Sequence, residues 1–124
     1  MNKTIGLSVI IPVFNEEEVL RKAYSRITKV MEACGEHYEL LFVDDGSTDG
    51  TASALRKLVQ DDHRVKGIIF SRNFGQQAAL SAGIECSSGR GVILIDADLQ
   101  DPPEVIPAMI DRWKEGYEVV YARR

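Results

Sequence analysis

Short apolar runs alternate with longer amphipathic segments along the whole chain. The runs are rich in β-branched residues, are bounded by turn residues, and lie at 6–12, 39–44, 65–71, 91–96 and 117–122. Several are apolar on successive residues, which is typical of strands covered on both faces, as in a parallel sheet. We therefore predict five strands.

The segments between these runs predict helices, because their apolar residues recur at spacings of three and four. The first helix has one apolar face, formed by Val19, Leu20, Ala23, Tyr24, Ile27, Val30 and Met31. Two more helices are expected at about 49–60 and 76–86. The fourth opens with Pro102 and Pro103, which a helix tolerates only in its first turn, and ends at Gly116.

Strands that alternate with helices need crossover connections, so the fold class is α/β. We expect a mainly parallel sheet with helices on both faces, forming one domain over 1–124. In such sheets ligands bind beyond the carboxyl ends of the strands. The residues that directly follow the strands are therefore the candidates for function.

Composition narrows the class of protein. The 124 residues are 44% hydrophobic and 27% charged, as in ordinary soluble domains. A net charge of −4 and scattered basic residues argue against nucleic acid as a partner, and no apolar run reaches the roughly 20 residues of a membrane span. Cys34 and Cys86 lie in predicted helices without metal-ligand spacing, which indicates reduced, buried thiols and a cytoplasmic location.

The first predicted strand ends in Pro12, Phe14, Asn15 and Glu16–Glu18. Asn15 is expected to cap the following helix, and the glutamates suit the positive end of the dipole of that helix. Capping does not account for Phe14, an aromatic residue in a loop after a strand, where a flat ring could lie beside a nucleobase.

Two adjacent carboxylates, Asp44 and Asp45, follow the second strand and repel each other unless a cation or a hydrogen-bond donor compensates. Gly46 suits a turn after Asp45, and one of Ser47–Asp49 is expected to cap the next helix. Asp44 is left without a structural role. It is well placed to accept hydrogen bonds from a base or from ribose hydroxyls.

The fourth strand leads into Asp96, Asp98, Gln100 and Asp101. Asp101 is expected to cap the helix that the two prolines open. In an extended chain the other three share one face, since residues two apart point the same way. Convergent oxygen ligands suit Mg²⁺ or Mn²⁺, and such an ion would stabilise a diphosphate leaving group.

Cations follow the third and fifth strands. Arg72 pairs either with a phosphate or with one of the many carboxylates, and the sequence leaves both open. Arg123 and Arg124 either meet phosphate or form a solvated end of the chain. His37 and His63 lie in polar connecting segments and are expected to be exposed rather than catalytic.

With these residues in view, the sequence resembles family 2 glycosyltransferases, and among them the group that acts on polyprenyl phosphates. The matching stretches span nearly the whole chain: SVIIPVFNEEE, ELLFVDDGSTDGT, SRNFGQQAALSAG, GRGVILIDADLQDPPEVIP and GYEVVYARR. DADLQDPPE is the most specific of these motifs.

The resemblance implies a GT-A fold that binds a nucleoside-diphosphate sugar of the UDP or GDP type. The residues carried over as the nucleotide site are Pro12, Phe14, Glu16, Asp44, Asp45, Arg72 and Asp96. Those carried over as the metal site, for Mg²⁺ or Mn²⁺, are Asp96, Asp98 and Gln100. It also implies inversion at the anomeric carbon, when an acceptor phosphate attacks the sugar and nucleoside diphosphate leaves.

Members of the family continue past the residue matched by Arg124 with an acceptor-binding half, a catalytic base and commonly transmembrane helices. We therefore expect a nucleotide-binding half with little or no transfer activity of its own. In a full-length protein it would act on a lipid phosphate at the cytoplasmic face of a membrane. Self-association through an exposed sheet edge is a further expectation.

Three alternatives remain. A non-catalytic nucleotide-binding module would keep the pocket and lack transfer activity. A phosphoryl-accepting receiver domain has the same architecture, but it carries its acids after strands one and three, whereas here they follow strands two and four. A sugar nucleotidyltransferase would need a glycine-rich basic loop after the first strand, where this chain has glutamates.

Overall fold

The computed structural model describes residues 5–95, 106–114 and 119–121. Within them strands and helices alternate as the apolar pattern predicts. The strands are β1 (Leu7–Val13), β2 (Tyr38–Asp44), β3 (Val65–Ile69), β4 (Gly91–Leu94) and β5 (Val119–Tyr121). The helices are α1 (Glu17–Cys34), α2 (Thr51–Asp61), α3 (Gln76–Cys86) and α4 (Ile106–Lys114).

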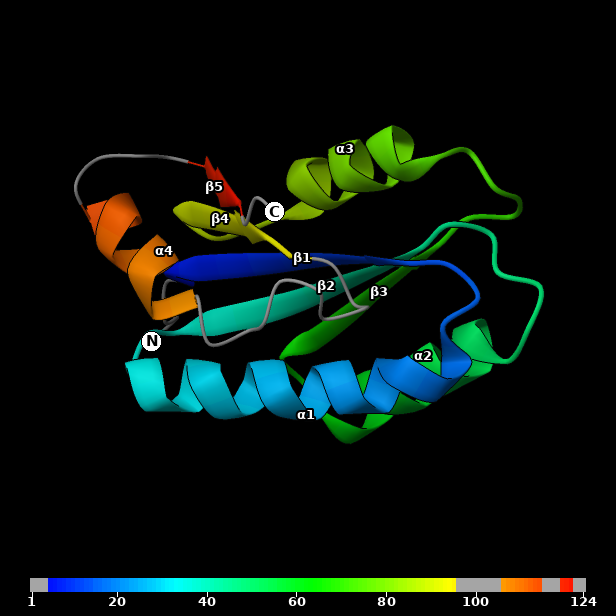
Figure 1. Ribbon diagram of the computed structural model, residues 1–124, viewed down its shortest axis with the longest axis horizontal. Helices are drawn as coiled ribbons and strands as arrows, with labels where there is room; N and C mark the ends of the chain where they lie inside the picture. The colour runs from blue at the N-terminus through cyan, green and yellow to red at the C-terminus, as the bar shows by residue number, and fades with distance from the viewer. Residues whose placement is uncertain (1–4, 96–105, 115–118, 122–124) are drawn as a thin grey trace.

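The strands form one parallel sheet in the order β3-β2-β1-β4-β5 (Figure 1). The predicted α/β class is confirmed. The predicted third strand, 65–71, is two residues too long, since β3 ends at Ile69. The N–H of Phe70 makes the last bond to β2, to the Asp44 carbonyl at 2.9 Å, and the chain then leaves the sheet. The start of the fourth predicted helix lies outside the described residues.

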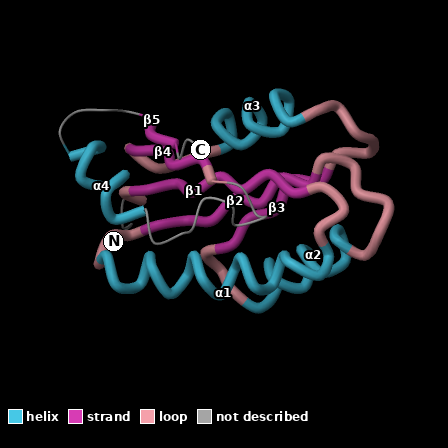
Figure 2. Tube along the Cα trace, viewed as in Figure 1, coloured by secondary structure: helices cyan, strands magenta, loops and turns pink. Residues whose placement is uncertain are grey.

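Helices lie on both faces of the sheet (Figure 2). An apolar layer on each face packs them against it. Alternate residues of β1 point to opposite faces, so Leu7, Val9 and Ile11 pack against α1, α2 and α4, while Ile10 packs against α3. The predicted apolar face of α1 is confirmed, and its fully buried members are Leu20, Ala23, Ile27 and Met31. Parallel strands with helices on both faces place every connection after a strand at one edge of the sheet.

A buried polar cluster lies at the amino edge of the sheet, on the α3 side. The Glu39 carboxylate is 1% exposed and accepts hydrogen bonds from the Ser8 hydroxyl and the Ser88 N–H, both 2.6 Å. Its other oxygen lies 2.6 Å from Lys66 Nζ. Burial raises the pKa of Glu39, but these donors outweigh burial and hold the pKa below the ordinary value.

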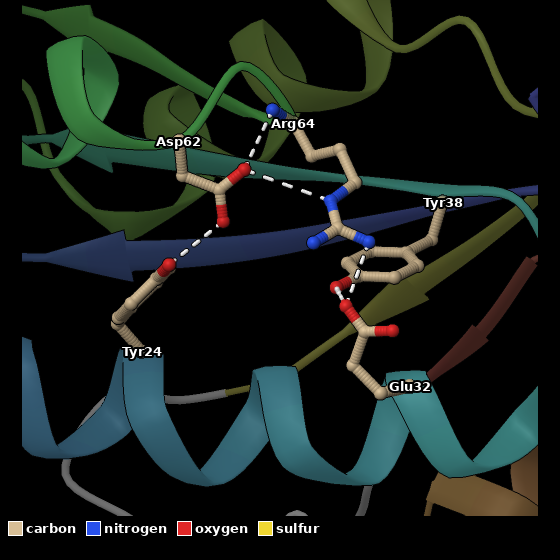
Figure 3. Close-up of polar contacts among 5 residues, drawn as sticks. All are labelled: Tyr24, Glu32, Tyr38, Asp62 and Arg64. Carbon is tan, nitrogen blue, oxygen red and sulfur yellow. Dashed lines mark hydrogen bonds and ion pairs between the residues drawn. The ribbon is translucent and has the colours of Figure 1, made fainter.

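A second network on the α1 side joins five side chains (Figure 3). Tyr24 donates to Asp62, 2.7 Å, and Arg64 pairs with Glu32, 2.7 Å, while its guanidinium lies 4.8 Å from the centre of the Tyr38 ring. Burial raises the pKa of Asp62, but the hydrogen bonds from Tyr24 and Arg64 lower it by more, so the net shift is downward. This network connects α1 to the turn before β3.

The two cysteines are free thiols at the ends of α1 and α3. Cys34 is half-buried, but Cys86 is exposed, so the expectation that both are buried is wrong for Cys86, which ends α3 beside the exposed Ile84 and Glu85. Within the described residues, the helices lack the continuous apolar length that a bilayer crossing requires.

Candidate functional site

The loops after β1, β2 and β3 gather at the carboxyl edge of the sheet, on the right of Figure 1. β1 and β2 end together, because Val13 is paired with Asp44 in the register. Backbone bonds extend this alignment: the N–H of Asp45 donates to the Val13 carbonyl, 2.9 Å. The sequence candidates from three separate segments therefore meet at one edge.

Asp44 is the last residue of β2 and is fully buried. Its Oδ1 accepts hydrogen bonds from the Ser47 N–H, 3.0 Å, and the Ser47 hydroxyl, 2.5 Å. Its Oδ2 is also buried, and no group among the described residues donates a hydrogen bond to it. A buried acceptor without a donor costs about 1–3 kcal/mol. A bound molecule that donated a hydrogen bond to this oxygen would remove that cost.

Asn15 joins the loop after β1 to the loop after β2. Its Oδ1 accepts hydrogen bonds from the Thr48 N–H, 2.8 Å, and from the Asp49 N–H, 3.4 Å. Its own N–H donates to the Ser47 hydroxyl, 2.8 Å. The prediction that Asn15 caps α1 is wrong: the cap residue is Glu16, and the Asn15 side chain is held by a loop more than 30 residues away.

The first turns of α1 and α2 satisfy each other's backbone groups. The Glu17 carboxylate accepts from the N–H of Gly50, 3.0 Å, and the Thr51 hydroxyl accepts from the N–H of Glu16, 3.0 Å. Asp49 accepts from both the N–H, 2.9 Å, and the hydroxyl of Thr51, and the hydroxyl bond chiefly lowers the pKa of Asp49. The expectation that one of residues 47–49 caps α2 is wrong: the cap residue is Gly50, and Asp49, one residue earlier, accepts from the N–H of Thr51.

The Asp45 side chain is bound by the loop before α3, whereas that of Asp44 is bound by the turn before α2. Its carboxylate accepts hydrogen bonds from the N–H of Phe74, 2.8 Å, the N–H of Gly75, 3.1 Å, and the Asn73 side-chain amide, 3.1 Å. It is 5% exposed. The repulsion expected between Asp44 and Asp45 is thus relieved in two ways, because each carboxylate has its own donors and the two serve different loops.

The aromatic and cationic candidates surround these carboxylates. Phe14 is 41% exposed at the exit of β1, and Glu16 folds back to accept from its N–H, 3.1 Å. Pro12 is half-buried in β1 beside Val43. Arg72 is exposed, and its guanidinium lies 4.6 Å from the centre of the Phe74 ring rather than on a carboxylate. Arg72 therefore has no acidic partner among the described residues.

The predicted metal ligands Asp96, Asp98 and Gln100, with Asp101 and the two terminal arginines, lie outside the described residues. The chain reaches that motif through Ile95, whose N–H donates to the Ile10 carbonyl, 3.1 Å, at the carboxyl end of β4. Within the described part of the chain, no group of three His, Cys, Asp or Glu side chains is placed to hold a metal ion. His37 and His63 are exposed, as predicted.

Solved structures with similar folds are glycosyltransferases, and the fold is of the GT-A type. One is a mannosyltransferase from Pyrobaculum calidifontis in complex with GDP-Man and Mn²⁺, with a TM-score of 0.69 and 23% identity, covering 84% of this chain and 31% of that one. Another is glucosyl-3-phosphoglycerate synthase from Mycobacterium tuberculosis with UDP, with a TM-score of 0.70 and 24% identity, covering 90% and 40%.

The model of glycosyl transferase family 2 matches residues 8–124, and the chain belongs to this family. A glycosyltransferase of Bacillus subtilis named YkcC, described as uncharacterized, is 53% identical over the whole chain and 38% of its own length. Bactoprenol glucosyl transferase of Shigella phage SfV is 43% identical over 95% of the chain and 38% of its own length. An undecaprenyl-phosphate 4-deoxy-4-formamido-L-arabinose transferase of Proteus mirabilis is 45% identical over 95% and 36%. The chain thus spans well under half the length of these relatives.

Several residues that shape this edge had not been predicted as part of the site. Ser47 orients Asp44, Asn73 binds Asp45, and Thr51 binds the backbone of Glu16. Ser47 lies in the turn before α2 and Thr51 is the first residue of that helix, and at both positions the sequence signals only capping. Their partners lie 3 to 35 residues away, so a local pattern shows the residue type but not the contact.

Proposed function

We propose that this chain binds a nucleoside-diphosphate sugar at the carboxyl edge of β1–β3, as the donor half of an inverting glycosyltransferase. The observation that carries the proposal is the buried Asp44 Oδ2, which has no hydrogen-bond donor among the described residues. A fold of the GT-A type and similarity to a structure with GDP-Man and another with UDP support the class of ligand.

Each candidate has a role in this proposal. Asp44 accepts hydrogen bonds from the base or the ribose, with Ser47 keeping its other oxygen occupied. Phe14 offers a half-exposed ring and Pro12 an adjacent apolar surface to the flat faces of base and ribose. Glu16 stiffens the loop that carries Phe14, and its carboxylate contacts the nucleoside.

The phosphate side of the site needs positive charge. Arg72 supplies it from the loop after β3, where its guanidinium rests on Phe74 and, within residues 5–95, on no carboxylate. Stacking on a ring leaves the N–H groups of the guanidinium free to bind phosphate oxygens. Asp45 belongs to the same edge, and its role is taken further below.

The chemistry of the donor set fits a divalent cation: Asp96, Asp98 and Gln100 offer three oxygen-bearing side chains, the type Mg²⁺ and Mn²⁺ prefer. Asp96 would also contact the ribose. When bound, the ion would neutralise the diphosphate and make it a better leaving group. The described residues contribute the rest, by orienting the nucleoside and by offering Arg72 to the phosphates.

The acceptor is proposed to be a polyprenyl phosphate at the cytoplasmic face of a membrane, because two similar proteins carry bactoprenol or undecaprenyl phosphate in their names. The acceptor site and the catalytic base would lie in sequence that the relatives have in addition to the matched part. We expect the chain to bind the donor and to transfer sugar slowly or not at all by itself.

Isothermal titration of the protein with UDP and GDP, each with and without Mn²⁺, tests the proposal. We expect binding of one nucleotide that strengthens with the cation. Asp44→Asn should weaken this binding by roughly 10- to 100-fold, since a hydrogen bond to a charged group contributes about 1.5–3 kcal/mol. The matched control is Asp62→Asn, the same change at the opposite edge of the sheet, which should leave affinity unchanged. No binding of either nucleotide, or full affinity in Asp44→Asn, would refute the proposal.

A further inference from the structure

We propose that Asp45 is a positioning residue that fixes the 72–75 loop relative to Asp44 and does not itself contact the nucleotide. This inference rests on the proposed function. It separates the two adjacent carboxylates, which the sequence presents as equivalent, into one that meets the ligand and one that holds the neighbouring loop.

The first observation is that protein donors occupy the Asp45 carboxylate. Oδ1 accepts from the Phe74 N–H, 2.8 Å, and more distantly from the Gly75 N–H, 3.3 Å, while Oδ2 accepts from the Gly75 N–H and from Asn73 Nδ2, both 3.1 Å. A carboxylate has about four acceptor sites. Because both oxygens are engaged and the residue is 5% exposed, little capacity remains for a ligand. Asp44 differs in having one oxygen to which no described residue donates.

The second observation is a direct backbone contact beside Asp45. Gly46 has a φ of 75°, and an added Cβ would lie 2.1 Å from the Arg72 carbonyl carbon and 2.4 Å from the Asn73 nitrogen. The turn after β2 is thus in close contact with the peptide that joins Arg72 to Asn73. Asn73 also donates to the Asp45 carbonyl, 3.2 Å. The two loops are therefore held together by side-chain and backbone contacts at once.

The loop held in this way displays the residues that the proposed site needs. Arg72 stacks on Phe74, 4.6 Å from the guanidinium carbon to the ring centre, and Phe74 meets Phe70 edge-on at 5.5 Å between ring centres. Phe74 is 51% exposed, so few contacts besides these two hold its ring in place. Gly75, the N-cap of α3, provides no side chain to cap the helix, and Asp45 takes that place from another loop.

If this loop lost its anchor, Arg72 would no longer have one place relative to Asp44. A ligand that touches both residues would then have to order the loop as it binds, which lowers its affinity. The loss of affinity should therefore occur only when Arg72 and Phe74 are present. A direct contact between Asp45 and the ligand would instead be lost whether or not those two side chains are present.

Amide hydrogen exchange in the free protein tests the anchor itself. Asp45→Asn keeps the shape of the side chain but turns an NH₂ group toward N–H donors. We expect the Phe74 and Gly75 amides to exchange at least 10-fold faster in Asp45→Asn, and to be unchanged in Asp62→Asn, where another hydrogen-bonded carboxylate is altered at the other edge. Unchanged exchange at both amides in Asp45→Asn would overturn the proposal.

A double-mutant cycle tests the functional part, with whichever of UDP and GDP the wild-type protein binds more tightly in the presence of Mn²⁺. Asp45→Asn should weaken affinity at least 5-fold in the wild-type background and less than 2-fold in a protein that already carries Arg72→Ala and Phe74→Ala. Equal losses in both backgrounds would show that Asp45 contacts the ligand, and no loss in the wild-type background would show that loop position is irrelevant. Either result overturns the proposal. If the wild-type protein bound neither nucleotide, the proposed function would fail, and exchange alone would decide whether Asp45 holds the loop.

Discussion

Replacing Gly46 with alanine measures how tightly the loops after β2 and β3 are packed. At a φ of 75° a Cβ costs roughly 1–2 kcal/mol in any surroundings. Here the Cβ would also lie 2.1 Å from the Arg72 carbonyl carbon, whereas ordinary contacts begin at 3.4 Å. The loop would have to retreat by about 1.3 Å, and forced overpacking costs about 1–3 kcal/mol more. We therefore expect Gly46→Ala to lower the free energy of unfolding by about 2–5 kcal/mol.

Gly35→Ala is the matched control for this change. Gly35 ends α1 with a φ of 74°, almost the same as that of Gly46, but no atom lies within 4 Å of an added Cβ. Its cost should be limited to the backbone strain of roughly 1–2 kcal/mol. Urea denaturation followed by circular dichroism gives both values. Equal costs in the two variants, within about 0.5 kcal/mol, would contradict the close contact between the loops.

Two further predictions concern polar side chains that join distant segments of the chain. Since the donors around Glu39 hold its pKa below 4.5, its contribution to stability is present above that value and is lost as the pH falls through the folded-state pKa. Denaturation between neutral pH and acid should show a larger loss in the wild-type protein than in Glu39→Gln, in which Asp49 and Asp62 still titrate; the same pH profile in both proteins would refute the assignment. Asn15 combines a φ of 50° with acceptance from the N–H of Thr48. Asn15→Ala should therefore cost about 1–3 kcal/mol, and Asn15→Gly less, because glycine removes the backbone strain. Equal costs for the two variants, measured by the same denaturation, would show that strain at this position is negligible.

The sequence alone determined the elements and their class. Runs that are apolar on successive residues predict strands covered on both faces, and β2, in which every residue is buried, is the clearest case. Spacings of three and four in α1 predict an inner face of seven residues, of which Leu20, Ala23, Ile27 and Met31 are fully buried and the other three half-buried. The spacing of apolar residues follows the period of the element, about 3.6 residues for a helix and two for a strand, and that period is local in the sequence.

Strand order and contacts between loops were decided only by the tertiary structure. The order β3-β2-β1-β4-β5 brings together three loops whose partners are about 30 residues apart in the chain. Asp44 and Asp45 look alike in sequence, yet one has an oxygen with no donor in the described part of the chain and the other is bound by Phe74 and Gly75. Asn15 has the residue type of a cap but serves another loop. Residue type determines what a side chain is able to bind, whereas the meeting of strand ends at one edge of the sheet determines which partner it has.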